Sequence, residues 1–572
     1  MRFLFSRLKP FVGRMSLGLA IKISGTMVEL FLPLILSHIL NVVIQTLDIA
    51  QIVFYGCVMI LCATAACVCN IIANRMAAHV SMEVSRALRR ELFDKTLRLS
   101  ARDTDRFTIP SLESRITSDT YNVHSFLNVM QRMGVRAPIL LVGGMILSFL
   151  MDPFLALVML AMLPFIFIIV YCISRKGTPL YTTVQKSVDN MVRVVREDTQ
   201  GIRVIKALSK NEYENSRYDT VNKALSQNER RAGRVTGIVN PVMTLMMNLG
   251  IATVVALSAV RVANNTSSPA TVIAFMQYFT LISMALMSIS RIFIMYTKCA
   301  ASASRIAEVV ETPQRFYVES NLPVRDHDPH IVFENVSFSY FGKRNNINNV
   351  SFSLPRGSSL GIIGATGSGK TTLLKLLLRF YDIDSGNIRI NGKSITAYTH
   401  EELTALFGIA QQNDFLYADT IEENIRFGRE MDFESVQHAA KIAQAHDFIM
   451  ETADGYQHLL AQKGTNLSGG QRQRLLIARA LAGSPEILIL DDSSSALDYK
   501  TDANLRKALR EALRESTFIT VAQRISSVKD CDLILVMEDG NIIGQGTHEE
   551  LMLSCAEYRE ISDSQMGGAF VE

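Results

Sequence analysis

Charged residues are missing from several long stretches of the sequence. Residues 49–74 contain no charge, residues 137–174 contain only Asp152, and residues 235–290 contain only Arg261. A bilayer core about 30 Å thick is crossed by roughly 20 helical residues. These uncharged runs are too long and too numerous for the buried helices of a soluble protein. The sequence therefore excludes a purely soluble protein.

A strong charge imbalance and a cysteine pattern are also absent. The chain has 58 Lys and Arg residues against 54 Asp and Glu residues, a formal net charge of +4, which is too small to suggest nucleic-acid binding. Its 8 cysteines show no metal-site or disulfide spacing. Cys67 and Cys69 are two positions apart, so they point to different faces of a helix. We interpret the cysteines as space-filling residues.

The apolar runs predict six membrane spans within the first 300 residues. One span covers residues 15–45, where Lys22, Glu29 and His38 interrupt it. Ionisable groups inside a membrane are functional candidates, so Lys22 and Glu29, which are seven apart, are expected to pair, to bond between helices or to face a substrate. The remaining spans are expected at 49–74, as a pair within 136–175, and as a pair within 234–291.

The distribution of Lys and Arg predicts the orientation of these spans. The N-terminus and the stretches 75–136 and 175–234 are rich in both residues, whereas the loops near Asp48, Asp152 and Asn264 hold almost none. By the positive-inside rule, both termini then lie in the cytoplasm. The second and fourth helices are expected to run far into the cytoplasm and turn there, near residues 105–111 and 211–217.

A glycine-rich motif for phosphate binding stands in the second half of the chain. Residues 364–371 read GATGSGKT, after a predicted strand at 360–364 and before a predicted helix at 373–380. This context lets backbone N–H groups and a helix N-terminus cradle phosphate oxygens. Lys370 is expected to reach the β and γ phosphates, and Thr371 to ligate Mg²⁺.

A second nucleotide motif ends the apolar strand predicted at 487–490. Asp491 follows it and is expected to hold the metal that neutralises charge on the transferred phosphoryl group. The predicted fold is an α-helical transmembrane domain fused to an α/β P-loop nucleotide-binding domain. We expect the membrane domain at 1–311, a linker at 312–330 and the nucleotide-binding domain at 331–572.

Between the two nucleotide motifs, residues 467–471 read LSGGQ, which resembles the signature of ATP-binding cassette (ABC) proteins. Six spans followed by one cassette are similar to the type IV exporter half-transporters. The resemblance implies that two cassettes pair head to tail, with each ATP between one phosphate loop and the other signature. It implies Mg²⁺ contacts from Thr371, Gln412 and Asp491. It implies ATP contacts from Tyr340, Gly364, Thr366, Gly367, Ser368, Gly369, Lys370, Thr371, Thr372, Gln412, Ser468, Gly469, Gly470, Gln471 and Asp498.

The sequence departs from that family at two catalytic positions. The family has Glu after the metal-binding Asp, where this chain has Asp492, and a downstream His, where this chain has Gln523. Asp is one methylene shorter than Glu, and Gln carries no charge and shuttles no proton. With Lys370, these are the expected catalytic residues. The pair resembles the slow site of heterodimeric exporters and implies a different partner chain with an intact Glu and His.

The leading functional hypothesis is ATP-driven export of hydrophobic or amphipathic compounds by alternating access. Two alternatives stay open: uptake, such as siderophore import by a similar fold, and an ATP-gated channel or sensor. The short outer loops and the cysteine usage fit a bacterial plasma membrane. The outer-loop sequon at 264–266 keeps a eukaryotic origin open.

Overall fold

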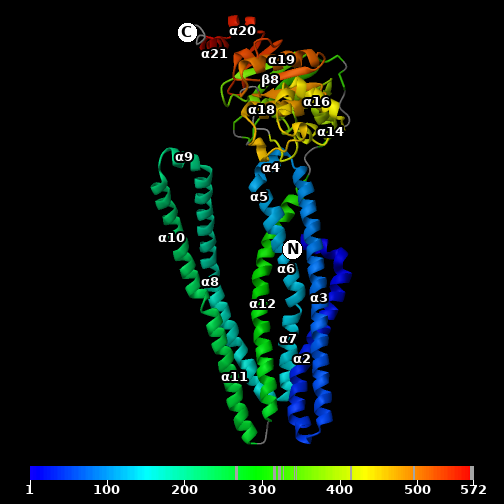
Figure 1. The fold of residues 1–572 in the computed structure, drawn as a ribbon, viewed down its shortest axis with the longest axis vertical. Coiled ribbons are helices and arrows are strands. Elements are labelled where there is room, and N and C mark those ends of the chain that lie inside the picture. Colours follow the sequence, from blue (N-terminus) through cyan, green and yellow to red (C-terminus); the bar gives the residue numbers. More distant parts are fainter. Residues whose placement is uncertain are drawn as a thin grey trace. The chain divides into compact units, whose positions relative to one another are not determined.

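The computed structural model describes residues 1–264, 268–313, 317–319, 324–325, 327–340, 342, 344–411, 415–493 and 496–566. The chain forms two compact units (Figure 1). The membrane unit comprises Met1–Leu97 and Ile109–Thr312, and the cassette unit comprises Arg98–Thr108 and Pro313–Glu572.

The membrane unit is helical throughout its described part. Short 3₁₀ or π turns are η1 (Lys9–Phe11), η2 (Ile39–Val43), η3 (Ile44–Thr46) and η4 (Arg115–Asp119). The α-helices are α1 (Arg2–Leu8), α2 (Val12–His38), α3 (Ile49–Leu97), α5 (Ile109–Ser114), α6 (Thr120–Met133), α7 (Arg136–Met151), α8 (Pro153–Gln200), α9 (Ile202–Ala207), α10 (Asn211–Thr236), α11 (Val239–Ala263) and α12 (Pro269–Val310).

Five helical segments among the described residues are long and apolar enough to cross a membrane. They are Phe3–Thr46, Ile49–Leu97, Ile109–Met151, Thr244–Ala263 and Pro269–Val310. The remaining predicted span falls on α8. Its apolar part, Pro153–Phe165, is shorter than the five candidate spans.

The second and fourth helices are long, as the charge pattern predicts. Helix α3 has 49 residues and α8 has 48. Helix α8 begins sharply because Asp152 caps it by accepting hydrogen bonds from the N–H groups of Phe154 and Leu155, with Pro153 at its first position. Arg261 of α11 forms an ion pair with Asp152, with 3.3 Å between Nε and Oδ2.

The turn after the fourth span lies earlier in the chain than the sequence suggests. Residues 211–217, expected at the turn, form the first turns of α10. The reversal runs through Gly201, α9 and Ser209, which has a φ of 51°. The prediction was wrong because residues 202–207 form a short helix of their own, which moves the turn ahead of Asn211.

The intramembrane ionisable residues bond between helices. The Lys22 ammonium donates to Asn70 Oδ1 at 2.6 Å and to Asn74 Oδ1 at 3.1 Å, which joins α2 to α3. Glu29 instead pairs with Arg136, with 2.6 Å between Oε1 and Nη2, which joins α2 to α7. Interhelical bonding is therefore confirmed for both residues, and Lys22 and Glu29 are not each other's partners.

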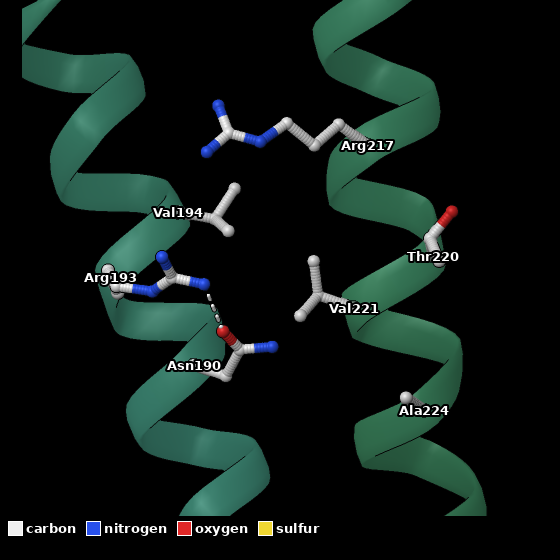
Figure 2. A pocket seen from close by; sticks show the side chains of 7 residues that line it. All are labelled: Asn190, Arg193, Val194, Arg217, Thr220, Val221 and Ala224. Atoms are coloured by element: carbon white, nitrogen blue, oxygen red, sulfur yellow. Dashed lines mark hydrogen bonds between the residues drawn. The ribbon is translucent and has the colours of Figure 1, made fainter.

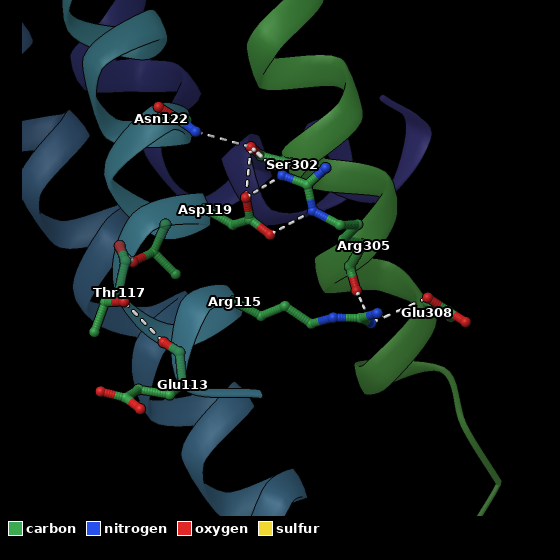
Figure 3. Close-up of polar contacts among 9 residues, drawn as sticks. Glu113, Arg115, Thr117, Asp119, Asn122, Ser302, Arg305 and Glu308 are labelled. Carbon is green, nitrogen blue, oxygen red and sulfur yellow. Dashed lines mark hydrogen bonds and ion pairs between the residues drawn. The ribbon is translucent and has the colours of Figure 1, made fainter. Parts of the chain in front are cut away.

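A partly buried polar cluster joins the N-terminal end of the third span to α12 (Figure 3). The Arg305 guanidinium donates two hydrogen bonds to the Asp119 carboxylate, and Ser302 Oγ donates another at 2.8 Å. Arg115 pairs with Glu308 at 3.0 Å. The π-helix η4 carries both Arg115 and Asp119, four positions apart, and both side chains point toward α12.

The cassette unit is an α/β domain with two sheets. Its strands are β1 (Ile331–Phe338), β2 (Ile347–Leu354), β3 (Ser359–Gly364), β4 (Ser385–Ile390), β5 (Lys393–Ser394), β6 (Phe407–Ala410), β7 (Ile487–Asp491), β8 (Thr517–Val521), β9 (Leu533–Glu538) and β10 (Asn541–Gly546). Its α-helices are α4 (Ala101–Phe107), α13 (Lys370–Leu377), α14 (His400–Ala405), α15 (Ile421–Arg426), α16 (Phe433–Ile442), α17 (His446–Met450), α18 (Gly469–Leu481), α19 (Tyr499–Ala512), α20 (His548–Ser554) and α21 (Ala556–Met566).

The larger sheet positions the nucleotide motifs. Its strand order is β10-β9-β3-β8-β7-β6, and the ladders of β3 with β8 and β9, of β8 with β7, and of β7 with β6 are parallel. The smaller sheet, β2-β1-β4-β5, is antiparallel. In a parallel sheet the carboxyl ends of the strands share one edge, where ligands bind. The ends of β3, β7 and β8 therefore meet at one edge.

Candidate functional site

The glycine loop after β3 has the backbone shape of a phosphate cradle. Gly364 has a φ of 152°, and a Cβ there would lie 2.1 Å from the Met537 carbonyl oxygen. Gly367 and Gly369 have φ values of 87° and 105°, which side chains rarely tolerate. The Ser368 hydroxyl is buried and has no hydrogen-bond partner among the described residues, so the loop retains an unsatisfied donor where a phosphate oxygen fits.

Lys370 begins α13 at the end of this loop. Its ammonium donates to the carbonyl oxygens of Gly364 and Ala365, both at 2.8 Å. Burial lowers the pKa of Lys370, and the carboxylates of Asp491 and Asp492 oppose that shift. The amine is thus a desolvated cation held at the mouth of the loop, where a phosphate is a stronger acceptor than a carbonyl. The strand, loop and helix predicted around 364–371 are confirmed by β3 and α13.

Asp491 and Thr371 form an oxygen-rich pair beside Lys370. Asp491 is the buried last residue of β7 and receives a hydrogen bond from the Thr371 side chain. Burial and then the charge of Asp492 raise the pKa of Asp491, while Lys370 and Thr371 act in the opposite direction. A carboxylate with a neighbouring hydroxyl suits Mg²⁺, which prefers oxygen ligands. Gln412, the third expected metal contact, lies outside the described residues.

Asp492 and Gln523, the two departures from the family pattern, face each other. Asp492 follows β7 in the left-handed region, with a φ of 49°, and its N–H donates to the Val521 carbonyl at 2.9 Å. Gln523 follows β8, and its Nε2 donates to Asp492 Oδ2 at 3.3 Å. Because Asp491 of β7 is in register with Val521 of β8, the side chains of Asp492 and Gln523, which follow these strands, lie at the same sheet edge.

Tyr340, the expected adenine contact, follows β1. Its hydroxyl donates to Thr372 Oγ1 at 3.3 Å, so the phenol is tied to α13 of the phosphate loop. Its ring packs edge to face with Tyr381 at 5.0 Å, and the Lys375 ammonium lies 5.9 Å from its centroid. The half-buried ring therefore lies beside the loop, while adenine stacking stays a prediction.

The signature residues form the start of α18. Ser468 caps the helix by accepting from the Gln471 N–H at 3.3 Å, and Gln471 Oε1 accepts from the Ser468 N–H at 2.9 Å. A Cβ on Gly470 would lie 3.2 Å from the Ala496 carbonyl oxygen, so glycine lets the two backbones approach. Asp498 likewise caps α19, where hydrogen bonds from Thr501 lower the pKa of Asp498.

The phosphate loop and the signature belong to different hydrophobic cores of the cassette. Leu373 and Leu374 of α13 lie in the core that includes the smaller sheet, whereas Leu475 and Leu476 of α18 lie in a second core. The fold thus gathers the phosphate loop, Asp491, Asp492 and Gln523 at one sheet edge and carries Ser468 on a separate helix. This separation fits a signature that serves a second cassette.

Two contacts near the site involve residues that belong to none of the sequence motifs. The short helix α4 belongs to the cassette unit, where Ala101 packs against its core and Asp105 accepts a hydrogen bond from the Tyr381 hydroxyl. Gln565, on α21, bonds the backbone on both sides of Arg524: it donates to the Gln523 carbonyl and accepts from the Ile525 N–H. The position of α4 between two predicted spans indicated a turn there, whereas no sequence pattern points to Gln565.

A pocket of 380 Å³ lies between α8 and α10 in the membrane unit (Figure 2). The pocket is lined by Asn190, Arg193, Val194, Arg217, Thr220, Val221 and Ala224. The charge of Arg217 is already neutralised by ion pairs with Glu197, Asp198 and Glu214.

A helical membrane unit, a P-loop cassette and an LSGGQ helix together define the class of ABC transporters. The family model of the ABC transporter transmembrane region matches residues 15–286, and the model described as ABC transporter matches residues 347–495. The chain belongs to this family. It is a multi-pass membrane protein and a half-transporter that binds nucleotide, works as a dimer in the bilayer and couples ATP hydrolysis to transport.

Particular relatives match nearly the whole chain. "Uncharacterized ABC transporter ATP-binding protein YfiB" of Bacillus subtilis (strain 168) is 34% identical over 564 residues, which cover 98% of each chain. A similarly named protein, MT1311 of Mycobacterium tuberculosis (strain CDC 1551 / Oshkosh), is 31% identical over 571 residues, covering 99% of this chain and 98% of that one. The structure of a bacterial Atm1-family ABC exporter with ATP bound has a TM-score of 0.81 at 23% identity and covers 99% of both chains, which shows the shared type IV exporter fold.

Proposed function

We propose that this chain is the slow-site half of a heterodimeric exporter of hydrophobic or amphipathic compounds. The observation that supports it is the pairing of Asp492 with Gln523, where the Gln523 amide donates to the carboxylate expected to polarise water. The apolar spans suit such substrates. The domain limits 1–311, 312–330 and 331–572 and a bacterial plasma membrane with cytoplasmic termini belong to the same proposal.

The residues of the glycine loop bind ATP. The loop's N–H groups and the Ser368 hydroxyl hold phosphate oxygens, and Lys370 leaves its two carbonyl partners for the phosphates. Thr371 and Asp491, together with Gln412, would hold Mg²⁺, which would supply positive charge against the phosphoryl oxygens. Tyr340 lies beside the loop, where its ring can stack on adenine.

Hydrolysis at this site is slow for two physical reasons. The Asp492 carboxylate is one methylene shorter than a glutamate, and a misplacement on the order of 1 Å costs about 10²-fold in rate where geometry is critical. Gln523 offers one neutral hydrogen-bond donor to Asp492, and it neither carries a charge to the γ-phosphate nor shuttles a proton. ATP therefore stays bound at this site for longer than the partner's site needs to hydrolyse one ATP.

The partner supplies the faster site. This chain has an intact signature, Ser468 to Gln471, held on a capped helix. In a head-to-tail dimer that signature completes the nucleotide site of the other cassette. A partner with Glu and His at the two departed positions then hydrolyses ATP there, and closure of the cassettes drives the spans from inward-facing to outward-facing.

The test is the subunit composition of the complex. The chain is tagged in its own host, extracted gently from membranes and weighed intact by native mass spectrometry. A one-to-one complex with a second, different ABC half-transporter is the expected result. A homodimer that hydrolyses ATP at ordinary rates contradicts the proposal, because both of its sites would then contain Asp492 and Gln523.

A further inference from the structure

The C-terminal helix α21 is bonded directly to the backbone that carries Gln523. Gln565 Nε2 donates to the Gln523 carbonyl oxygen at 2.8 Å. Gln565 Oε1 accepts from the Ile525 N–H, also at 2.8 Å. One side-chain amide thus bonds the main chain before and after Arg524, as a neighbouring β-strand would, where β8 has ended at Val521.

Helix α21 is itself anchored, so it can act as a support for this loop. Tyr558 is fully buried and lies in one hydrophobic core with Ala522 and Ile525, and Ile561 packs against that core. Tyr558, Ile561 and Gln565 follow at spacings of three and four, which places them on one helix face. The Tyr558 hydroxyl also lies 2.8 Å from His548 Nδ1, which ties α21 to α20.

We propose that Gln565 is a positioning residue for the nucleotide site. It fixes the backbone of 523–525 so that the Gln523 amide stays directed at Asp492 Oδ2. The C-terminal helix thereby becomes part of the site, and displacing it loosens the contact expected to hold water and nucleotide. This inference rests on the proposed slow site, since its main readout is how long ATP stays on this chain.

The experiment uses the full-length chain in the complex it forms, in nanodiscs. The complex is loaded with radiolabelled 8-azido-ATP and Mg²⁺, chased with ATP, cross-linked by light at intervals, and separated so that each chain is counted alone. Q565A should shorten the half-life of label on this chain about three- to tenfold, the effect of losing one or two hydrogen bonds. Q565E keeps the shape but removes the donor to the Gln523 carbonyl, and it should have the same effect.

The design separates positioning from mere support of the fold. If Gln565 acts through Gln523, the double variant Q523A/Q565A should retain label for as long as Q523A alone. Among the described residues, Ser564 bonds its own helix, at the Ile561 carbonyl, so S564A should match wild type in retention and in melting temperature. Unchanged retention in both Gln565 variants, or additive losses in the double variant, overturns the proposal.

Failure of the proposed slow site is recognisable independently. In that case wild-type chain retains no label after the chase. The role of Gln565 is then decided by kcat for ATP hydrolysis, where the same non-additivity with Q523A is expected and simple additivity overturns it.

Discussion

The Tyr381 hydroxyl donates a hydrogen bond to the Asp105 carboxylate, although 276 positions separate them in sequence. Burial and the neighbouring Asp105 raise the pKa of Tyr381, so the phenol stays a donor throughout the working pH range. Asp105 lies in α4, which comes between the second and third spans in the chain and belongs to the cassette unit. This contact is thus a direct bond from the interspan segment to the cassette.

Replacing Tyr381 by Phe should weaken the coupling of ATP hydrolysis to transport. A hydrogen bond to a charged group contributes about 1.5–3 kcal/mol, so its loss loosens α4 without removing the ring. We expect substrate-stimulated ATPase and vesicle transport to fall about tenfold, with basal ATPase kept. Tyr456 also bonds through its hydroxyl, to His446 at 2.9 Å, so Y456F is the matched control. Equal loss of basal and stimulated activity in Y381F would argue against this role.

Restoring the family residues should accelerate this chain's own site. Asp492→Glu together with Gln523→His extends the carboxylate by one methylene and restores a titratable donor. ATP turnover on this chain should rise about 10- to 100-fold, less for either single change, measured as phosphate release with the partner's site inactivated. The exposed-surface change Asp530→Glu should leave the rate unchanged. A double variant as slow as wild type would contradict the slow-site proposal.

Removing the metal or its carboxylate should separate binding from hydrolysis. Asp491→Asn keeps the hydrogen bond from Thr371 but loses the charge that holds Mg²⁺. Hydrolysis at this site should fall by about 10²-fold or more, as it should in EDTA, while fluorescent ATP still binds within a fewfold of wild-type affinity. Asp530→Asn serves as the control. Unchanged Mg²⁺ dependence of hydrolysis in D491N would show that Asp491 does not hold the metal.

The cassette should lose stability as the pH falls below about 6.5, the ordinary histidine value. Burial lowers the pKa of His330, with Arg356 acting in the same direction and Glu486 opposing it. Below about pH 6.5 the histidine is protonated in the unfolded chain but still neutral in the folded chain. Acidification therefore favours the unfolded state, and the free energy of unfolding falls. Thermal unfolding between pH 5 and 8 should show this slope, and His330→Gln should flatten it.

His438→Gln is the control for that experiment, because His438 is exposed. It should retain the wild-type slope. A slope in H330Q that equals wild type would assign the acid sensitivity to other groups.

Local patterns were sufficient for the strand, loop and helix that carry the nucleotide motifs, while the roles of the individual site residues stay predictions. The strand, glycine loop and helix around 364–371 and the acid that ends β7 were predictable because each depends on a few adjacent residues. The helix that begins in the signature and its Ser468–Gln471 capping box came from the structure. The great length of α3 and α8 followed from the distribution of charge. The turn at 211–217 was placed wrongly because a short helix, α9, precedes it, and such boundaries depend on tertiary packing.

The sequence by itself determined that this chain has apolar spans, binds phosphate and departs from its family at Asp492 and Gln523. These are properties of residue types and short spacings, which chain folding does not alter. Only the tertiary structure decided which distant residues meet. The parallel register of β7 and β8 brings Gln523 to Asp492, and the packing of Tyr558 brings Gln565 to the same loop. Pairings across tens or hundreds of residues depend on sheet order and core packing, for which a single sequence carries no local signal.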